Sequence, residues 1–355
     1  MRAESYDFLK SIEETPSVSG YEQPVARIIR KRMARFADDV RTDVHGNVTA
    51  VINPKAATRV MLAGHMDQIG FLVNFINDNG YVHMCAVGGI DNSVLPGSRV
   101  TIHAKNGPIT GVIGRKAIHL MKVEERNAGK IELVDVAVDI GAKDKKQAQE
   151  LVDVGDPITY QLGLEKVLND RVISPGLDNK VGAFVVMEAL RLLSTEKKLN
   201  VGVYAVATVQ EEIGLRGART AAYAIDPSVG IAVDVCHASD YAAVDKRVAG
   251  DVVIGGGPVI ARGANINPVL GQLFVDTAKK AKIAYQVDAA PGATGTDANA
   301  MQISRAGIAA GLVSIPNRYM HTQVELCSLD DLDNAAKLIA ETIKRIDAKT
   351  SFIPM

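Results

Sequence analysis

The chain has 355 residues, 47% hydrophobic and 23% charged, which is the composition of a folded globular protein and excludes a disordered one. Its 40 lysines and arginines nearly balance 41 aspartates and glutamates, so a nucleic-acid-binding or membrane-surface protein is not expected. The sequence has no long uncharged apolar run, no apolar leader and no C-x-x-C spacing among its three cysteines. We therefore expect a cytoplasmic enzyme with one large or two modest domains.

The first 40 residues carry a helical pattern. Apolar residues recur at helical spacing between Val25 and Phe36, with basic residues on the opposite face. Ser19 is expected to cap this helix, with Gln23 close to the capping-box position. Two short β-type runs follow, and then an apolar strand over residues 60–67, VMLAGHMD.

The pattern changes between Ile69 and about Tyr160, where short β-branched runs are separated by glycines. This spacing predicts a small antiparallel barrel or sandwich. A helical segment over residues 143–154, KDKKQAQELVDV, lies near its end. An all-β segment therefore interrupts the chain.

Strands and helices alternate again after about Leu164. The run VGVYAVATV has no polar alternation, which is typical of a buried strand in a parallel sheet. Together these patterns predict an α/β fold whose sheet is interrupted by an inserted all-β segment, a small barrel or a sandwich. The predicted strands cover residues 201–209, 229–235 and 308–315, and the predicted helices cover 178–195, 214–225, 268–283, 296–307 and 329–346.

Carboxylates and imidazoles gather at the predicted strand ends. His65 and Asp67 are two residues apart, so both side chains can face one site in an extended chain. Ligands of α/β proteins collect beyond the carboxyl ends of the strands, where these residues would meet. The candidates are His65, Asp67, Asp178, Glu211, Glu212, Asp234 and His321.

Each candidate taken alone also has an ordinary structural explanation. Asp178 could cap a helix, and Glu211 with Glu212 could be solvated loop charge. His65 could be a hydrogen-bonded core histidine, and Asp234 could be a paired structural acid. Their coincidence at one edge of a sheet is what favours a shared site, because burying several unpaired charges together is costly.

The combination of two histidines with aspartates and a glutamate suits zinc, cobalt or manganese better than calcium. Two cations about 3.5–4 Å apart need one carboxylate that bridges them and further ligands that each bind only one of the cations. Three carboxylate ligands carry less negative charge than two divalent cations carry positive charge, which leaves room for one bound hydroxide. Glu211, beside Glu212, would be free to move protons. Glycoside hydrolysis fits poorly, since adjacent glutamates do not straddle a sugar bond at the required separation.

Six segments make the chain similar to a known family: AGHMDQIGF, PGLDNKVGA, VQEEIGLRGA, AVDV, GTDAN and IPNRYMHTQVE. The sequence resembles the tetrahedral, dodecameric metallo-aminopeptidases of glutamyl, deblocking and lysyl types, some of which carry the name endoglucanase. The resemblance covers essentially the whole chain, including the β insert. It implies a zinc-exopeptidase-like catalytic domain of residues 1–67 and 164–355, with a mixed, mostly parallel sheet flanked by helices. Residues 68–163 would form an inserted small β-barrel that serves for dimerisation.

The resemblance also implies roles for the candidate residues. Asp178 would bridge two divalent metal ions, zinc or cobalt, and a cis peptide would join it to Asn179. Glu211 would be the general base, and Asp67 would orient His65. The metal ligands would be His65, Asp178, Glu212, Asp234 and His321.

The implied function is removal of the N-terminal residue from short peptides with a free N-terminus, through a metal-bridging hydroxide. The expected assembly is a homododecamer built from dimers. Residues 292–300 and Arg318-Tyr319 are expected near the substrate, although Thr296 could equally cap a helix and Arg318 could hold a carboxylate at a subunit contact. The alternatives are a di-metal hydrolase of another amide, deacylase-like or carboxypeptidase-like, and a non-catalytic assembly protein. Cys236 and the other five histidines are expected to have no catalytic role.

Overall fold

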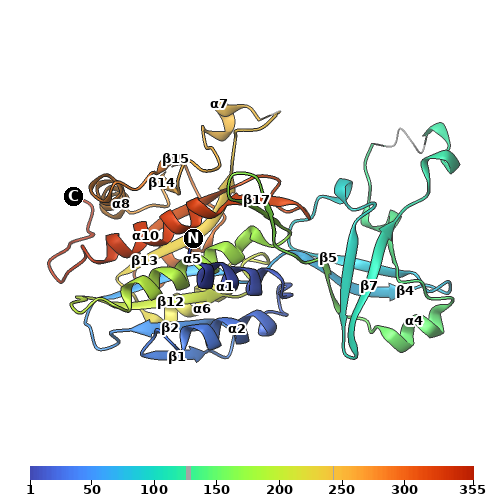
Figure 1. Ribbon diagram of the computed structural model, residues 1–355, viewed down its shortest axis with the longest axis horizontal. Coiled ribbons are helices and arrows are strands. Elements are labelled where there is room, and N and C mark those ends of the chain that lie inside the picture. The colour runs from blue at the N-terminus through green and yellow to red at the C-terminus, as the bar shows by residue number, and fades with distance from the viewer. Residues whose placement is uncertain (125–128, 243) are drawn as a thin grey trace.

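The computed structural model describes residues 1–124, 129–242 and 244–355. Figure 1 shows helices packed around a large sheet and, beside them, a smaller body made mostly of strands. Within the described ranges the large sheet has eight strands, in the order β1-β2-β12-β3-β13-β16-β14-β15. Their bounds are β1 Asp39–Thr42, β2 Val48–Ile52, β12 Gly202–Thr208, β3 Arg59–His65, β13 Val229–His237, β16 Ala309–Asn317, β14 Val259–Gly263 and β15 Gln286–Ala290.

The centre of this sheet is parallel. β12, β3, β13 and β16 run parallel to their neighbours, and β14 runs parallel to β15. The β1–β2, β2–β12 and β14–β16 pairs are antiparallel. The predicted mixed, mostly parallel sheet is confirmed.

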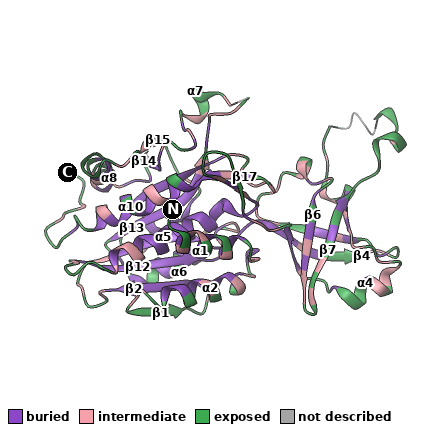
Figure 2. Ribbon diagram, in the orientation of Figure 1, coloured by how far each residue is buried: buried purple, intermediate pink, exposed green. Residues whose placement is uncertain are grey.

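Helices cover both faces of the sheet because its central strands turn apolar side chains toward both faces. In β3, Val60 and Leu62 face one core, whereas Met61 and Ala63 face the other. The first core is covered by α1 Ala3–Glu13, α2 Gln23–Met33, α5 Leu177–Leu193, α8 Pro268–Ala281 and α10 Leu329–Ile343. The second is covered by α6 Arg216–Ile225 and α9 Asp297–Gln302. Figure 2 shows the central strands and α5 as buried.

The inserted segment forms a closed barrel in the order β4-β5-β8-β7-β6-β9, which confirms the expected barrel. Phe71, Ile102 and Tyr160 belong to its own apolar core, separate from the cores of the large sheet. The elements of this segment are β4 Gly70–Ile76, β5 Val82–Val87, η1 Asn92–Val94, β6 Arg99–Ala104, β7 Gly107–Gly114, η2 Ile118–Leu120, η3 Leu133–Asp135, β8 Ala137–Asp139, α4 Lys145–Leu151 and β9 Pro157–Tyr160.

A small antiparallel sheet was not predicted from the sequence. It pairs β10 Glu165–Val167, β11 Arg171–Ser174 and β17 Glu325–Ser328. Its strands are too short to show a clear period, and β17 joins β11 from a distant part of the chain. β14 and the edge strand β15 were also not predicted, and each has only five residues. One further short helix, α7 Lys246–Ala249, precedes β14.

The N-terminal region differs from the prediction. It forms two helices rather than one continuous pattern, and Ser19 caps neither of them. Helix α2 begins after Glu22 and has Pro24 in its first turn, where the missing N–H of proline costs no hydrogen bond. The Ser19 hydroxyl donates instead to Asp67 Oδ2, at 2.7 Å. In the described part of the chain, no helix is long and apolar enough to span a membrane.

Candidate metal centre

The candidate residues meet where the parallel strands end. β3 ends at His65, Asp234 lies near the end of β13, and Glu211 follows β12 closely. Because these strands are parallel neighbours, their carboxyl ends lie at one edge of the sheet. Asp178 enters from the start of α5, and His321 enters from the loop after β16.

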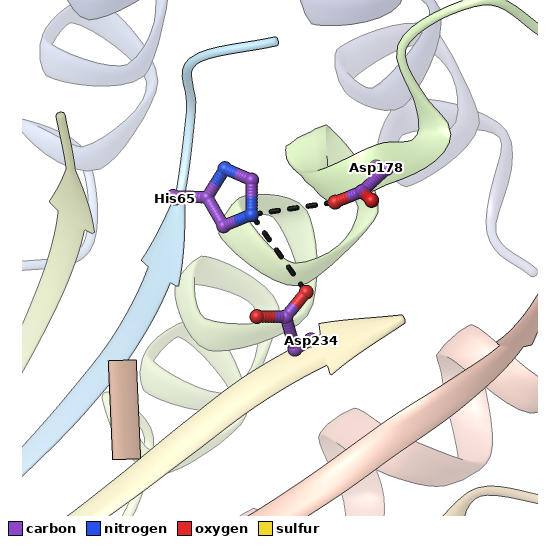
Figure 3. Close-up of side chains that lie close together, drawn as sticks. All are labelled: His65, Asp178 and Asp234. Atoms are coloured by element: carbon purple, nitrogen blue, oxygen red, sulfur yellow. Dashed lines mark ion pairs between the residues drawn. The ribbon is translucent and has the colours of Figure 1, made fainter. Parts of the chain in front are cut away.

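One group of possible metal ligands contains His65, Asp178 and Asp234. In Figure 3 the His65 imidazole points toward both carboxylates. Its Nε2 atom lies 3.3 Å from Asp178 Oδ1 and 3.7 Å from Asp234 Oδ1. All three residues are buried.

A second group contains Asp178, Glu212 and His321. The His321 Nε2 atom lies 3.2 Å from Asp178 Oδ2 and 3.6 Å from Glu212 Oε2. Asp178 therefore belongs to both groups and turns one carboxylate oxygen toward each. The remaining oxygen of Glu212, Oε1, is shielded from solvent and has no hydrogen-bond partner among the described residues.

This donor set suits two divalent cations. Each group offers one imidazole nitrogen and carboxylate oxygens, which are ligands that zinc and cobalt accept. A carboxylate with one oxygen on each side can serve two cations at once. The unpartnered Glu212 oxygen gives further acceptor capacity at the second group. The residues present therefore fit a two-cation centre.

The acids of the site resist ionisation because they are buried. Burial raises the pKa of Asp234 and raises that of Glu212 well above its usual range, with the Asp178 charge adding to the effect at Glu212. Asp178 behaves differently: burial opposes its ionisation, but hydrogen bonds with His321 and His65 hold its pKa below the usual range. Buried acids of this kind ionise readily only beside positive charge, which divalent cations would supply.

The two imidazoles respond to the same acids. Burial opposes protonation of His65, yet the surrounding carboxylates, led by Glu211, raise its pKa well above the usual range. The hydrogen bond to Asp178 raises the pKa of His321. A cation bound here would replace these protons, so binding would release protons to solvent.

Glu211 lies beside His65 of the first group and belongs to neither group. Its Oε2 atom is 3.6 Å from His65 Nε2, and its side chain lines the cleft. Burial raises the pKa of Glu211 to about 9. At this value the carboxyl keeps its proton at neutral pH, and positive charge from bound cations would lower the pKa toward the range in which a carboxylate accepts and returns a proton.

Asp67 contacts His65, as expected, and also contacts the backbone of the glutamate pair. The closest contact to His65 Nδ1 is the Asp67 backbone oxygen at 3.1 Å, while carboxylate Oδ1 lies 3.5 Å away. The carboxylate itself accepts hydrogen bonds from the backbone N–H groups of Glu211 and Glu212. Asp67 therefore contacts the imidazole mainly through its backbone and the glutamate pair through its side chain.

Two buried acids of this region were assigned no role from the sequence. Glu325 accepts hydrogen bonds from the backbone of Asp178 and of His321. Asp297 accepts one from Thr208, and burial raises its pKa to about 7. Both stand in quoted family segments, GTDAN and IPNRYMHTQVE, and acids inside those segments were the available signal.

The candidate ligands line a cleft of about 680 Å³. Part of the expected substrate segment lines it too, from Ala293 to Thr296, and Thr296 also caps α9 by accepting from the Ala298 N–H. Thr296 therefore caps a helix and lines the cleft, and its nearness to the substrate stays a prediction. Cys236 lines the cleft but belongs to neither ligand group.

Arg318 and Tyr319 are not among the described residues that line this cleft, although their neighbours Met320 and His321 are, so the expectation for them stays a prediction. Arg318 forms a paired contact with Asp240 of the same chain, at 2.9 and 2.7 Å. The guanidinium therefore holds a carboxylate of its own chain. The peptide bond between Asp178 and Asn179 is cis, as the resemblance implied.

Comparisons with known proteins agree on one family. The family model of the M42 glutamyl aminopeptidases matches residues 46–338. The lysyl aminopeptidase of Pyrococcus furiosus is 40% identical over 349 residues, which are 96% of this chain and 98% of the relative.

Two solved structures have the same fold over nearly their whole length. A TET aminopeptidase from a marine sediment archaeon of the Thaumarchaeota matches with a TM-score of 0.92 and 35% identity, covering 97% of each chain. The dodecameric PhTET1 matches with a TM-score of 0.84 and 31% identity, covering 96% of this chain and 98% of that one.

Proposed function

The chain belongs to the M42 glutamyl aminopeptidase family and is a peptide hydrolase, and from this premise we propose that it removes N-terminal residues from short peptides with two bound divalent cations. The observation that carries the proposal is Asp178, which turns one oxygen to each of two ligand groups. Zinc and cobalt are the cations we propose, because each group combines imidazole nitrogen with carboxylate oxygen.

When bound, the cations would supply Lewis acidity that makes a water molecule nucleophilic and polarises the scissile carbonyl. The ligands would be His65 and Asp234 on one side and Glu212 and His321 on the other, with Asp178 shared. Glu211 would take the proton from the water and deliver it to the departing amine. A positioned acid and base of this kind contributes about 10²–10⁴-fold to the rate. Nearby carboxylates would bind the free α-amine of the substrate, which makes the enzyme an exopeptidase.

The charge of the cleft favours basic over acidic N-terminal residues. Asp288 lines it away from the ligand groups, and none of the described residues that line it is a lysine or arginine. Asp288 lies on β15, three strands from Asp234 on β13, so about 14 Å separates their backbones at the usual strand spacing. A lysine or arginine side chain extending from the catalytic end would approach Asp288. The name of the Pyrococcus furiosus relative, a lysyl aminopeptidase, agrees with this preference.

We propose that the catalytic domain comprises residues 1–67 and 164–355, and that the barrel domain, residues 68–163, mediates dimerisation. Apolar side chains exposed on the barrel domain support a covered surface there, among them Ile118, Leu120 and Val134. The dodecameric PhTET1 supports a homo-oligomer and, for this chain, a dodecamer built from dimers. Three free cysteines agree with a reducing, cytoplasmic location.

The test compares free and N-acetylated peptides of equal sequence after removal and return of metal. We expect a chelator to abolish release of the first residue, cobalt or zinc to restore it, and the acetylated peptide to resist cleavage. Full activity after chelation would overturn the metal mechanism. Cleavage of the blocked peptide would indicate the deacylase-like or carboxypeptidase-like alternative.

A further inference from the structure

Glu325 is a fully buried carboxylate that contacts the backbones of two proposed metal ligands. Its Oε2 atom accepts a hydrogen bond from the Asp178 N–H at 2.7 Å. Its Oε1 atom accepts one from the His321 N–H at 2.9 Å. One side chain thus joins the start of α5 to the loop after β16, and both oxygens are used in doing so.

The backbone that carries Glu325 is itself held in place. Glu325 is the first residue of β17, and it lies opposite Ser174 in the antiparallel pair with β11. Leu326, the next residue, exchanges two backbone hydrogen bonds with Arg318, both 3.1 Å long. The carboxylate therefore projects from a paired strand, which gives it a defined position relative to the ligands.

His321 has particular need of such a contact. Its φ angle is 63°, in the left-handed region that non-glycine residues seldom occupy without support. Its side chain is 33% exposed, compared with 8% for Asp178, so less packing surrounds its imidazole. The N–H···Oε1 bond therefore supports the backbone of a ligand that is less enclosed than its partners.

The charge on Glu325 has a buried counterpart. Lys180 is fully buried, and its Nζ atom donates to the backbone oxygens of Thr15 at 2.8 Å and Glu13 at 3.4 Å. The negative charges of Glu13 and Glu325 act on this ammonium and oppose the lowering of its pKa by burial. Glu13 shares this charged cluster but makes its side-chain hydrogen bond to Ser174 and to neither ligand.

We propose that Glu325 is a positioning residue that sets the placement of Asp178 and His321 and thereby the affinity for the cation between them. It would not be a ligand itself, because both of its oxygens already accept backbone N–H groups. The inference rests on the proposed function, since it requires cations in the centre. A purely structural Glu325 would hold β17 against α5 without affecting cation affinity.

The variant Glu325→Gln tests this with little change of shape. The amide keeps one acceptor and replaces the other with an NH₂ donor, so either the Asp178 or the His321 N–H loses its partner. Glu13→Gln is the matched control. It neutralises the other buried acid of the Lys180 cluster, and its carbonyl oxygen can still accept from Ser174.

Chelated wild-type and variant proteins would be titrated with Co²⁺ by calorimetry, and their melting temperatures would be measured with and without Co²⁺. We expect Glu325→Gln to lose about 10–100-fold in affinity for one of two Co²⁺ ions, as for other residues that hold metal ligands. Glu13→Gln should stay within about threefold of wild type. Both variants should melt at lower temperature without metal, but only Glu325→Gln should gain less from Co²⁺.

Unchanged Co²⁺ affinities in a folded Glu325→Gln protein would overturn the inference, as would an equal loss in Glu13→Gln. If Glu325→Gln does not fold, Glu325→Asp serves instead: it keeps the charge, but its shorter side chain cannot span both N–H groups, so the same loss is expected. Wild-type protein that binds no Co²⁺ would instead contradict the proposed function.

Discussion

The carboxylate of Asp67 accepts a hydrogen bond from the backbone N–H of Glu211, with Oδ1 at 3.1 Å from the nitrogen. Its other oxygen accepts from the Glu212 N–H at 3.2 Å and from the Ser19 hydroxyl at 2.7 Å. The residue two positions after one proposed ligand thus holds the backbone of the proposed base and of another ligand. The ends of β3 and β12 are connected by this one side chain.

Replacing Asp67 with asparagine should weaken both the fold and the reaction. The amide can accept from only one of the two N–H groups, and leaving a buried donor unpaired costs about 1–3 kcal/mol. We expect a loss of this size in urea unfolding and at least a tenfold lower kcat, because Glu211 and Glu212 would shift. Ser19→Ala is the control: it removes only the hydroxyl donor and should retain near-normal kcat. Equal kcat values in the two variants would show that Asp67 is not needed to hold the glutamates.

Replacing Glu211 with glutamine should separate catalysis from metal binding. Glu211 belongs to neither ligand group, so the variant should keep both cations, measured by elemental analysis. Its kcat should fall by about 10²–10⁴-fold, because the amide cannot carry the proton. A variant with full metal content and a normal rate would exclude Glu211 as the base.

Replacing Asp288 with asparagine should reduce the preference for basic N-terminal residues. A partly exposed charge pair contributes up to about 1 kcal/mol, so kcat/KM for lysyl substrates should fall about fivefold. Leucyl substrates provide the internal control, and their kcat/KM should change less than twofold, since they carry no side-chain charge for Asp288 to attract. A parallel fall for both substrates would place Asp288 outside the recognition of the side chain.

Glu22 should make stability depend on pH. Burial raises its pKa to about 7 in the folded protein, above the ordinary value of 4.5 that it regains on unfolding. The folded state therefore binds the proton more tightly, so the stabilisation is complete below pH 4.5 and is lost as the pH rises through about 7. The difference amounts to at most about 3 kcal/mol.

The check is urea unfolding of wild type and Glu22→Gln between pH 5 and pH 8. Glu22 Oε1 accepts from the N–H groups of Gly20 and Gln210, and the glutamine carbonyl can accept from both. The variant should therefore lose less stability than wild type over this range. Identical slopes in the two proteins would show that Glu22 does not titrate there.

Much of the architecture could be predicted from local patterns. The strand that ends at His65 and the helix after Asp178 have the apolar content and periodicity of their types, and both form. The all-β insert was predicted from short β-branched runs separated by glycines. Ser19 shows the limit of such reasoning. It has the chemistry of a helix cap, yet its hydroxyl donates a hydrogen bond to the buried carboxylate of Asp67 from another segment.

The sequence by itself determined the types of the main elements, the barrel insertion and the imidazole and carboxylate chemistry at the strand ends, because those depend on residues close together in the chain. Only the tertiary structure decided which side-chain carboxylates accept hydrogen bonds from which backbone N–H groups. Asp67 and Glu211 are 144 residues apart, and Asp178 and Glu325 are 147 apart. Hydrogen bonds over such separations depend on packing of the sheet and of α5, which no local pattern encodes, so these contacts of Asp67 and Glu325 emerge only from the fold.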